Sequence, residues 1–396
     1  MQVVHIVSFI VFVYVGLSVI YLFLFAMAGR FGKLKKYTID EKKAMIAVLI
    51  PSYRDDSVIL DTALQALKQS YPSERYTVTV IADGLQADTI QQLKRLPIQV
   101  VEVSFDVSMK AKSLNAAFSQ LPSGVYDIAM ILDSDNIMNP DCLEKVNHAF
   151  QQGWQVIQCH RTAKNKNTAV AILDALSEEV NNTIFRRGHR AAGFSCTLIG
   201  SGMAFKYELL KDIFALPEIQ NNPGEDREVD IQLVKKNIIV EYIDDAYVFD
   251  EKVQRKEVFE KQRTRWLGTQ VEQAGRFFRK DMLSLFWRKT YINKCFQNFL
   301  LPRLLFVLLF FFILITCAVD IITGYGLLMP SWHWWVALFL IYVVTMLLAV
   351  PSSFYNRKTG KAILQVPVLI VSMIKALLKI GQNKKGFLHT PKEFSK

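Results

Sequence analysis

The stretch AMIAVLIPSYRD, residues 44–55, decides the fold that we expect for this chain of 396 residues. Its first seven residues are all apolar, which is typical of a strand buried on both faces of a parallel sheet. Further along the chain, short apolar runs predict strands at 76–82, 98–103 and 127–132, and the segments before each of them predict helices at 56–70, 89–96 and 113–120. Strands that alternate with helices predict an α/β domain with a mixed, mostly parallel sheet.

Charged side chains follow the predicted strands, at the edge where open α/β sheets bind ligands. Asp83 follows the second strand, and Asp133 and Asp135 directly follow the fourth, with Lys110 at the start of a helix between them. Two carboxylates two residues apart can ligate one hard cation, while diphosphate oxygens complete its coordination. Each piece alone also fits a solvated turn, but their order behind successive strands favours a site for a metal and a phosphorylated ligand.

Several short motifs occur in a fixed order along the chain: Asp83, KAKSLN at 110–115, ILDSDN at 131–136, IGSGMAF at 199–205, GED at 224–226 and QRTRW at 262–266. Together they resemble the membrane-integrated, processive branch of the family 2 glycosyltransferases, which includes cellulose, chitin and hyaluronan synthases. The resemblance extends from about Ile46 to Trp266. It implies a GT-A type domain that transfers a sugar from a UDP-linked nucleotide sugar to a growing β-linked polysaccharide.

The resemblance also implies roles for individual residues. Asp226 is expected to be the catalytic base, with Glu225 beside it, and a single base opposite the leaving group implies inversion at the anomeric carbon. Asp135 and Asp133 are expected to bind Mg²⁺ or Mn²⁺. The residues expected to bind the donor are Pro51, Tyr53, Asp55, Asp83, Lys110, Asp133, Gln262, Arg263 and Arg265. The residues expected to bind the acceptor are Gly200, Ser201, Gly202 and Trp266.

Other roles are open for some of these residues. Asp226 precedes a helical pattern, so it could instead cap a helix. Trp266 could anchor the chain at a membrane surface rather than stack on a sugar. Gly200 and Gly202 could form a plain turn, although glycine also lets a backbone approach an acceptor closely.

The composition indicates a soluble domain joined to membrane segments. Hydrophobic residues make up 51% of the chain and the mean hydropathy is +0.20, but 47 Lys and Arg and 36 Asp and Glu must reach water. These values exclude a disordered chain and a purely membrane-embedded bundle. Five scattered cysteines without a CxxC pair argue against a zinc site or a secreted disulfide framework.

Two apolar zones are predicted to cross the membrane. Residues 4–28 carry no charge and span roughly 37 Å as a helix, and residues 299–351 predict a helical hairpin with tryptophans at one end. The sequence AMA at 26–28 also fits a signal-peptide cleavage site, but the long apolar run and the missing basic n-region favour a retained span. Residues 362–374 predict an interfacial helix, with a fourth span as the alternative.

The net charge of +11 is explained mainly by basic residues that are expected to set the orientation of the chain in the membrane. Basic residues follow each apolar zone, so the positive-inside rule predicts an outside N-terminus and a cytosolic catalytic domain at the inner (cytoplasmic) membrane. The predicted divisions are a transmembrane helix at 1–29, a cytosolic glycosyltransferase domain at 30–270, interfacial helices at 271–298, a transmembrane hairpin at 299–351, and an interfacial helix with a basic tail at 352–396.

The expected partners are a nucleotide sugar, a polysaccharide or glycan acceptor, the lipid bilayer, and an oligomer or export partner, since three spans enclose little. The basic and aromatic residues of 271–298 could in principle bind nucleic acid, but no nucleic-acid module accompanies them. One alternative function is single-sugar transfer to a polyprenyl phosphate or lipid. Another is an inactive assembly or export subunit, which an intact set of acidic residues disfavours.

Overall fold

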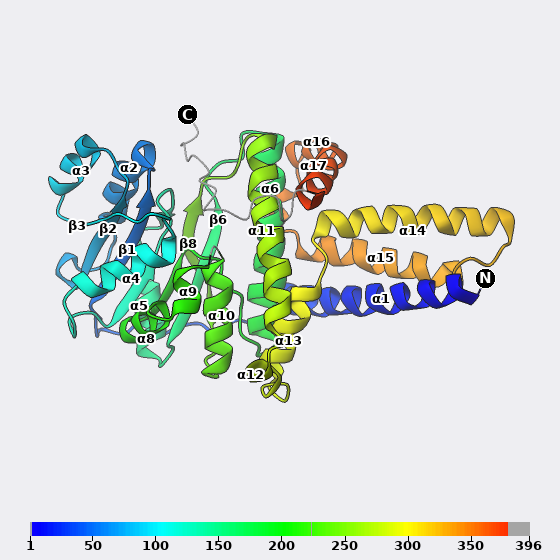
Figure 1. The fold of residues 1–396 in the computed structure, drawn as a ribbon, viewed down its shortest axis with the longest axis horizontal. Helices are drawn as coiled ribbons and strands as arrows, with labels where there is room; N and C mark the ends of the chain where they lie inside the picture. The colour runs from blue at the N-terminus through cyan, green and yellow to red at the C-terminus, as the bar shows by residue number, and fades with distance from the viewer. Residues whose placement is uncertain (1, 223, 379–396) are drawn as a thin grey trace.

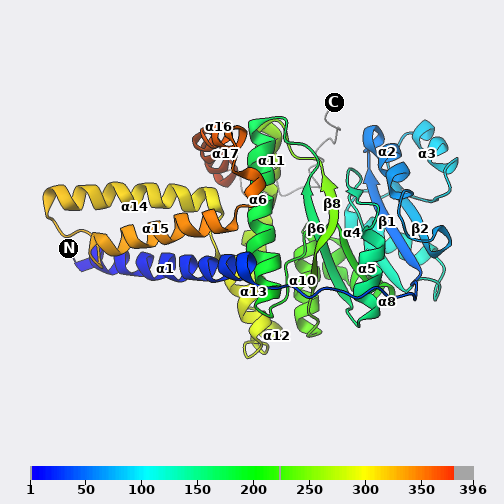
Figure 2. The ribbon, with the colours of Figure 1, turned by 180° about the vertical axis from the view of Figure 1, so that it is seen from behind.

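The computed structural model describes residues 2–222 and 224–378, and it consists of a sheet-based domain at one end and apolar helices at the other (Figure 1). The basic tail predicted for residues 379–396 lies outside the described residues. Between the two ends stands a layer formed by α6 (Ala169–Asn181) and α11 (Lys256–Arg276), as the view from behind also shows (Figure 2).

Eight strands of the described residues form one mixed sheet in the order β3-β2-β1-β4-β7-β6-β8-β5. The block β3-β2-β1-β4 is parallel throughout, and β6 and β8 are also parallel, whereas β7 and β5 pair antiparallel with their neighbours. The expectation of a mixed, mostly parallel sheet is confirmed. The strands are β1 (Ile46–Tyr53), β2 (Tyr76–Asp83), β3 (Gln99–Val103), β4 (Ile128–Ile131), β5 (Ile137–Met138), β6 (Val156–Ala163), β7 (Met203–Lys206) and β8 (Glu241–Asp250).

Helices cover both faces of the sheet, which explains the unbroken apolar run in β1. Ile46, Val48 and Ile50 point into the core on one face, while Ala47 and Leu49 point into the core on the other. The helices of this domain are α2 (Asp56–Ala66), α3 (Ala87–Lys94), α4 (Lys110–Gln120), α5 (Cys142–Gln151), α7 (His189–Ala191), α8 (Tyr207–Phe214), α9 (Pro217–Gln220) and α10 (Glu225–Lys235), with a 3₁₀ turn at η1 (Ser73–Arg75) and a π-helical turn at η2 (Asn182–Gly188).

The helix predicted at 56–70 ends at Ala66, four residues early. Leu67 still donates its amide to Ala63, but the chain then turns, and the Ser70 amide donates to the carbonyl of Pro140 at 2.7 Å. Tyr71 is buried and donates its hydroxyl to the carbonyl of Ala44 at 2.7 Å. Tertiary contacts, rather than helix propensity, therefore end this helix.

Among residues 2–222 and 224–378, three helices are long and apolar enough to cross a membrane: α1 (Gln2–Phe31), α14 (Arg303–Thr323) and α15 (Trp332–Ala349). In Figures 1 and 2, α15 runs between α1 and α14, and it packs against both. The predicted zones 4–28 and 299–351 correspond to these helices. Because α1 and α14 lie on opposite sides of α15, the three spans form a layer rather than a closed ring.

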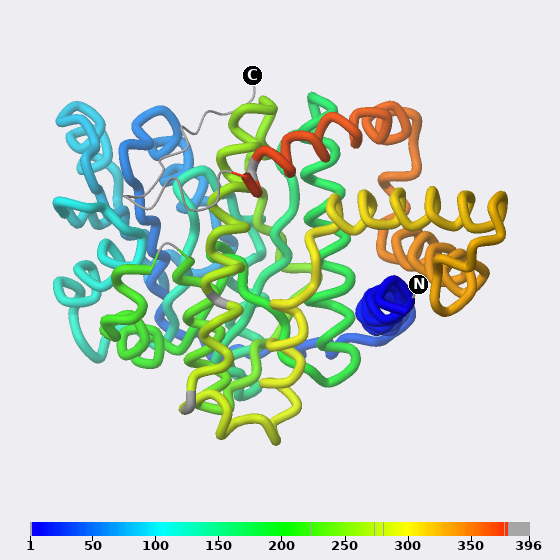
Figure 3. The backbone as a smooth tube through the Cα atoms, turned by 45° about the vertical axis from the view of Figure 1, so that its right-hand side comes forward, coloured from blue at the N-terminus to red at the C-terminus, as the bar shows by residue number. Residues whose placement is uncertain are grey.

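Helices at the junction lie across the direction of the spans. The shorter helices are α12 (Lys280–Leu283), α13 (Lys289–Phe299), the 3₁₀ turn η3 (Ser352–Phe354), α16 (Arg357–Ile363) and α17 (Val366–Leu378). Figure 3 shows the red helices α16 and α17 passing over the green layer, where α16 packs on α6 and α17 packs on α11. The sequence prediction placed α6 and most of α11 in the cytosolic domain, put the boundary to the interfacial helices after residue 270, within α11, and did not foresee that both helices face the spans.

Candidate active site

The carboxyl ends of β1, β2 and β4 meet at one edge of the sheet because these strands are parallel neighbours. Asp83 ends β2, is buried, and accepts a hydrogen bond from Ser113 Oγ at 3.5 Å. Burial raises the pKa of Asp83 above its ordinary value. Asp55 follows β1 and accepts a hydrogen bond from Ser134 Oγ at 2.5 Å. The sheet topology thus brings Asp55 into contact with the acidic loop that follows β4, 79 positions further along the chain.

Lys110 links the acidic loop after β4 to the loop before β7. Its Nζ donates to Asp133 Oδ1 and, at 2.6 Å, to the carbonyl oxygen of Gly200. Glu225 Oε1 lies 3.9 Å from the same Nζ. Because Lys110 is the first residue of α4, its ammonium is held at the edge of the sheet, among the acidic side chains.

Gly200 separates Lys110 from Asp226. The backbone of Gly200 has a φ of 79°, which favours glycine, and a Cβ there would lie 3.8 Å from Lys110 Nζ and 3.9 Å from Asp226 Oδ2. Asp226 is the second residue of α10, whose N-cap is Gly224, and Asp226 Oδ1 accepts the amide of Arg227 at 2.8 Å. Asp226 is therefore not the N-cap, and its second carboxylate oxygen lies close to Gly200.

Glu225 directly precedes Asp226 in α10, and 12% of its side chain is exposed. Burial, and then the charge of Asp226, raise the pKa of Glu225 to about 7, against the opposing effect of Lys110. Two adjacent carboxyl groups thus differ in environment at one end of the cavity, and Glu225 titrates near neutral pH.

The long helix α11 carries the predicted QRTRW motif. The guanidinium of Arg263 lies between the rings of Phe259 and Trp266, 4.6 and 4.4 Å from their centroids, and forms an ion pair with Asp174 of α6. Gln262 Oε1 is buried and has no hydrogen-bond partner among the described residues. Arg263 is thus engaged by α6, and contact between it and a diphosphate remains a prediction.

Ser201 and Gly202 lie behind the loop that presents Gly200. Ser201 Oγ donates to Asn136 Oδ1 at 2.5 Å and accepts the amide of Asp133 at 2.9 Å. Gln158 of β6 donates to the carbonyls of Ser201 and Gly202 at 2.9 and 3.0 Å. These contacts join the glycine loop to the acidic loop, and neither Ser201 nor Gly202 is among the residues that line the cavity. Sequence reasoning missed Gln158, which carries no motif.

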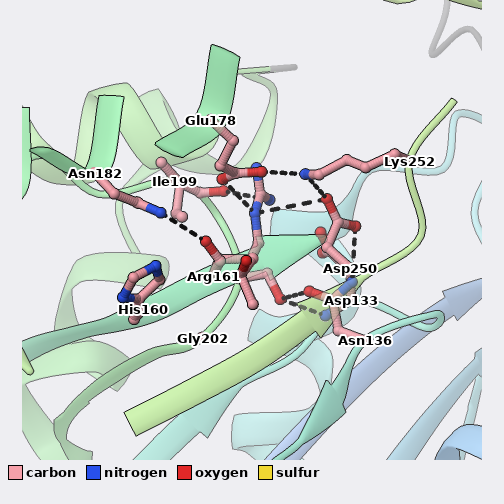
Figure 4. A network of polar contacts seen from close by, with 12 residues as sticks. Asp133, Asn136, His160, Arg161, Glu178, Asn182, Ile199, Gly202, Asp250 and Lys252 are labelled. Atoms are coloured by element: carbon pink, nitrogen blue, oxygen red, sulfur yellow. Dashed lines mark hydrogen bonds and ion pairs between the residues drawn. The ribbon is translucent and has the colours of Figure 1, made fainter. Parts of the chain in front are cut away.

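A buried ionic network supports the acidic loop from below (Figure 4). Lys252 donates to Glu178 and, at 2.6 Å, to Asp250, while Arg161 Nε donates to Glu178 at 2.9 Å. Although burial alone would raise it, the charges of Arg161 and Lys252 hold the pKa of Glu178 well below its usual range. Asn136 continues the network by donating to Asp250 at 3.1 Å. Sequence reasoning did not identify these supporting charges.

One cavity of about 1280 Å³ connects the sheet edge, the layer of α6 and α11, and the ends of the apolar helices nearest to that layer. Its walls include apolar residues of α14, α15 and α17 as well as the polar site. The predicted site residues that line this cavity are Pro51, Tyr53, Asp55, Asp83, Lys110, Asp133, Asp135, Gly200, Glu225, Asp226, Gln262, Arg263, Arg265 and Trp266.

The acidic loop has the chemistry to hold a divalent cation together with a phosphorylated ligand. No three His, Cys, Asp or Glu side chains of the described residues are grouped closely enough to hold a metal by themselves. Asp135 is buried beside Asn136, which donates to its Oδ1 at 3.2 Å, and Asp133 is held by Lys110. Two carboxylates suit Mg²⁺ or Mn²⁺ when phosphate oxygens supply other ligands, so the residues fit such an ion.

A mostly parallel α/β sheet, an acidic loop after its fourth strand and a carboxylate beside a glycine loop define a GT-A-like glycosyltransferase. The chain belongs to the glycosyltransferase like family 2, whose family model matches residues 43–269. No curated protein matches the sequence. The fold and the family show that the chain is an enzyme of the glycosyltransferase class.

The chain is similar to several solved structures at low sequence identity, and one of them has a TM-score above 0.5. The mannosyltransferase PcManGT from Pyrobaculum calidifontis, in complex with GDP-Man and Mn²⁺, has a TM-score of 0.54 at 15% identity, covering 94% of this chain and 97% of that one. TarS (residues 1–349) of S. aureus has a TM-score of 0.42 at 14% identity and covers 86% and 91%. Glucosyl-3-phosphoglycerate synthase of Mycobacterium tuberculosis has a TM-score of 0.41 at 16% identity and covers 59% and 80%.

Proposed function

We propose that the chain is a membrane-anchored, inverting glycosyltransferase that takes its sugar from a UDP-linked donor in the presence of Mg²⁺ or Mn²⁺. The observation that carries the proposal is the pair of groups on either side of Gly200. Lys110 Nζ and Asp226 Oδ2 both lie within 4 Å of the position of a Gly200 Cβ, and both residues line the cavity. An ammonium group that can bind a diphosphate and a carboxylate that can accept a proton from a hydroxyl are therefore close together.

The proposed reaction uses these groups in one displacement. An acceptor hydroxyl oxygen forms a bond to the anomeric carbon and gives its proton to Asp226, while the bond from that carbon to the diphosphate breaks and its electron pair leaves with the phosphate. Lys110 balances the developing charge. Attack opposite the leaving group inverts the anomeric configuration.

A divalent ion held by Asp135 and Asp133 would neutralise charge on the diphosphate when bound. The P. calidifontis mannosyltransferase, in complex with GDP-Man and Mn²⁺, supports a nucleotide-sugar donor and a divalent ion for this chain. That the nucleotide is uridine rather than guanosine, and that either Mg²⁺ or Mn²⁺ serves as the ion, is part of what we propose.

The substitution Asp226→Asn tests the base. It keeps the size of the side chain but removes the proton acceptor, so we expect transfer to fall by about 10²–10⁴-fold. Binding of the nucleotide, measured by calorimetry with Mn²⁺ present, should change little. Wild-type rates in the variant would contradict the assignment, whereas failure of the wild-type chain to turn over any nucleotide sugar would contradict the proposed function.

The acceptor is the second part of the proposal. The motif set favours a growing β-linked polysaccharide, which would need an oligomer or an export partner because the three spans form a layer rather than a closed ring. A lipid acceptor is favoured by a different observation, namely that the cavity continues between apolar side chains of α14, α15 and α17. Product length separates the two: a ladder of sugars indicates a polymerase, and one sugar on a lipid-soluble product indicates a lipid acceptor.

A further inference from the structure

Beyond the polar site, the cavity has an arm that membrane helices line with one face each. On α14 this face carries Arg303, Phe306 and Val307, which are three and four residues apart and therefore lie side by side. On α15 it carries Tyr342 and Met346, again four residues apart. Helices α6 and α17 add further apolar side chains to this part of the lining, while Ser177 and Asn181 of α6 and Arg303 of α14 are its polar members.

The chemistry of this arm suits hydrocarbon rather than sugar. Phe306, Val307 and Met346 offer no hydrogen-bond donors, so a saccharide placed there would lose its hydrogen bonds to water without replacement. A hydrocarbon chain has no hydrogen bonds to water to lose, and its transfer out of water is favourable in free energy.

Arg303 lies at the polar end of the arm, and its hydrogen-bond acceptors among the described residues are uncharged, although the carboxylate of Asp174 also acts on it electrostatically. Arg303 Nη1 donates to Asn181 Oδ1 at 2.8 Å, and its Nη2 donates to the carbonyl of Ser177 at 2.6 Å. Among the described residues, these and the Ser177 hydroxyl are the acceptors of Arg303, and all are uncharged. Arg263, by comparison, is paired with Asp174.

Two neighbouring residues each have one buried polar atom without a hydrogen-bond partner among the described residues, although Arg186 Nη1 donates to Asn182 Oδ1. Arg186 lies within electrostatic range of Arg303, is 3% exposed, and has no hydrogen-bond partner at Nε among the described residues. The Tyr342 hydroxyl is likewise buried and unpartnered there, and its ring stacks on Phe306 with the centroids 5.3 Å apart. An anion rich in acceptor oxygens would satisfy this environment, because charge-assisted hydrogen bonds are strongest in such surroundings.

The polar end of the arm is connected to the proposed base. Arg227, which follows Asp226, donates to Asn298 Oδ1 at 3.1 Å. Asn298 precedes Arg303 by five residues, which limits their separation to about 18 Å even in an extended chain. Asp226 and Arg303 line the same cavity, so a lipid that lies along the cavity can have its anionic part at Arg303 and a headgroup hydroxyl towards Asp226.

We propose that the acceptor is a phosphate-bearing membrane lipid with a free hydroxyl on its headgroup. Its hydrocarbon chain occupies the arm between α14, α15 and α17, its phosphate binds Arg303 near Tyr342, and its hydroxyl receives the sugar at Asp226. The proposal rests on the proposed function and adds the class of acceptor. The group-transfer step is the displacement described above, with the lipid hydroxyl as the attacking oxygen.

Binding to the full-length chain in detergent, measured by native mass spectrometry, tests the proposal without catalysis. The probes are phosphatidylglycerol, which has chains, phosphate and hydroxyls; diacylglycerol, which lacks the phosphate; and glycerol 3-phosphate, which lacks the chains. We expect phosphatidylglycerol to bind at least tenfold more tightly than either of the others. Equal binding of diacylglycerol would overturn the phosphate site, and equal binding of glycerol 3-phosphate would overturn the role of the arm.

Variants locate the binding. Arg303→Gln should weaken phosphatidylglycerol binding by about 10- to 100-fold, as loss of a charge-assisted contact does, and Arg303→Lys should lose less. Met346→Trp, which fills the arm, should also weaken it. Matched controls are Arg279→Gln, an exposed arginine, and Val344→Trp, an exposed α15 residue, because neither lines the cavity. Unchanged binding in both Arg303→Gln and Met346→Trp would overturn the proposal.

Nucleotide binding keeps this test separate from the proposed function. If the chain binds UDP with Mn²⁺ and releases it from a nucleotide sugar, but no label enters phosphatidylglycerol and no lipid binds at Arg303, the lipid proposal fails and the glycosyltransferase stands. If lipid binds but no nucleotide sugar is bound or consumed, the proposed function fails.

Discussion

At the scale of single residues, the site depends on two adjacent carboxyl groups with different surroundings. Asp226 Oδ2 lies close to Gly200, whereas the largely buried Glu225 has its Oε1 3.9 Å from Lys110 Nζ. The raised pKa of Glu225, about 7, means that the folded chain binds a proton there that the unfolded chain releases near its ordinary pKa of about 4.3. The folded state is therefore penalised when Glu225 is ionised.

Replacing Glu225 by Gln should change stability in a pH-dependent way. Below about pH 4.3 Glu225 is protonated in both the folded and the unfolded state, so the variant and the wild type should have the same melting temperature. Above pH 7 the variant should have the higher melting temperature, and its unfolding free energy should exceed that of the wild type by up to about 3 kcal/mol. Thermal unfolding in detergent at pH 4.5 and pH 8, without metal or nucleotide, measures this. Glu208→Gln, at an exposed carboxylate, is the control. A variant that is less stable at pH 8 would refute the raised pKa.

The site residues that could be predicted from the sequence differ from those that could not in how the fold determines their positions. Asp83, Asp133 and Asp135 could be predicted because parallel strands bring their carboxyl ends to one edge, so position behind a strand implies proximity. Lys252 and Glu178 could not, because they are 74 positions apart and each is a single charge in an ordinary segment. Only the folded chain shows that they pair.

At the scale of elements, a histidine joins three parts of the domain. His160 of β6 lies between Glu179 of α6, at 3.1 Å, and Asp244 of β8, whose carbonyl and carboxylate oxygens lie 2.8 and 3.4 Å away. Burial by itself lowers the pKa of His160, but the hydrogen bonds to Asp244 and Glu179 outweigh it and raise the pKa to about 9. Charged His160 therefore fastens the helix to the sheet.

The substitution His160→Gln should destabilise the chain most at low pH. The stabilising effect of the histidine is fully present below its unfolded pKa of about 6.5 and is lost as the pH rises through about 9. We expect a loss of up to about 3 kcal/mol at pH 6, measured by thermal unfolding, and a difference that shrinks towards pH 10. His333→Gln, at an exposed ring, should show no such trend. A pH-independent loss would mean that packing, not charge, explains the effect.

The N-terminal span meets the domain through glycine. A Cβ on Gly188 of η2 would lie 2.1 Å from the carbonyl oxygen of Phe25 in α1, and a Cβ on Gly29 would lie 2.1 Å from that of Thr183. These distances are shorter than any real contact, so the two backbones touch directly. The predicted boundary at residue 29 thus falls within a packed contact rather than at a flexible linker.

We expect Gly188→Ala to force α1 away from η2 and to cost about 1–3 kcal/mol of unfolding free energy. Gly275→Ala in α11, where a Cβ would meet nothing within 4 Å, should be neutral or stabilising by up to about 1 kcal/mol. Thermal unfolding of both variants in detergent provides the comparison. Equal stability of the two variants would show that the close contact is absent.

At the scale of the whole molecule, the layer of α6 and α11 determines how the catalytic end meets the spans. Sequence patterns predicted the three spans, because long apolar runs need no tertiary information. They did not predict that α6 and α11 face the spans or that one cavity joins both ends. The sequence of each helix alone does not distinguish it from the other helices of the soluble domain. The arm with Arg303 follows from this arrangement.

The predicted orientation can be tested by cysteine labelling in intact cells. A cysteine at Tyr325, exposed in the turn between α14 and α15, should react with a membrane-impermeant maleimide from outside. A cysteine at Lys33, which follows α1, should react only after the membrane is permeabilised, because the basic side faces the cytosol. The reverse pattern would contradict a cytosolic catalytic domain.

The central claim is that this chain transfers a sugar from a nucleotide donor with inversion. The most direct measurement incubates the purified full-length chain, Mn²⁺ and membrane lipid with α-linked UDP- and GDP-sugars, and then determines the anomeric configuration of the product by NMR. The account predicts a β-linked product from one of these donors, absent in the Asp226→Asn variant. An α-linked product would contradict it.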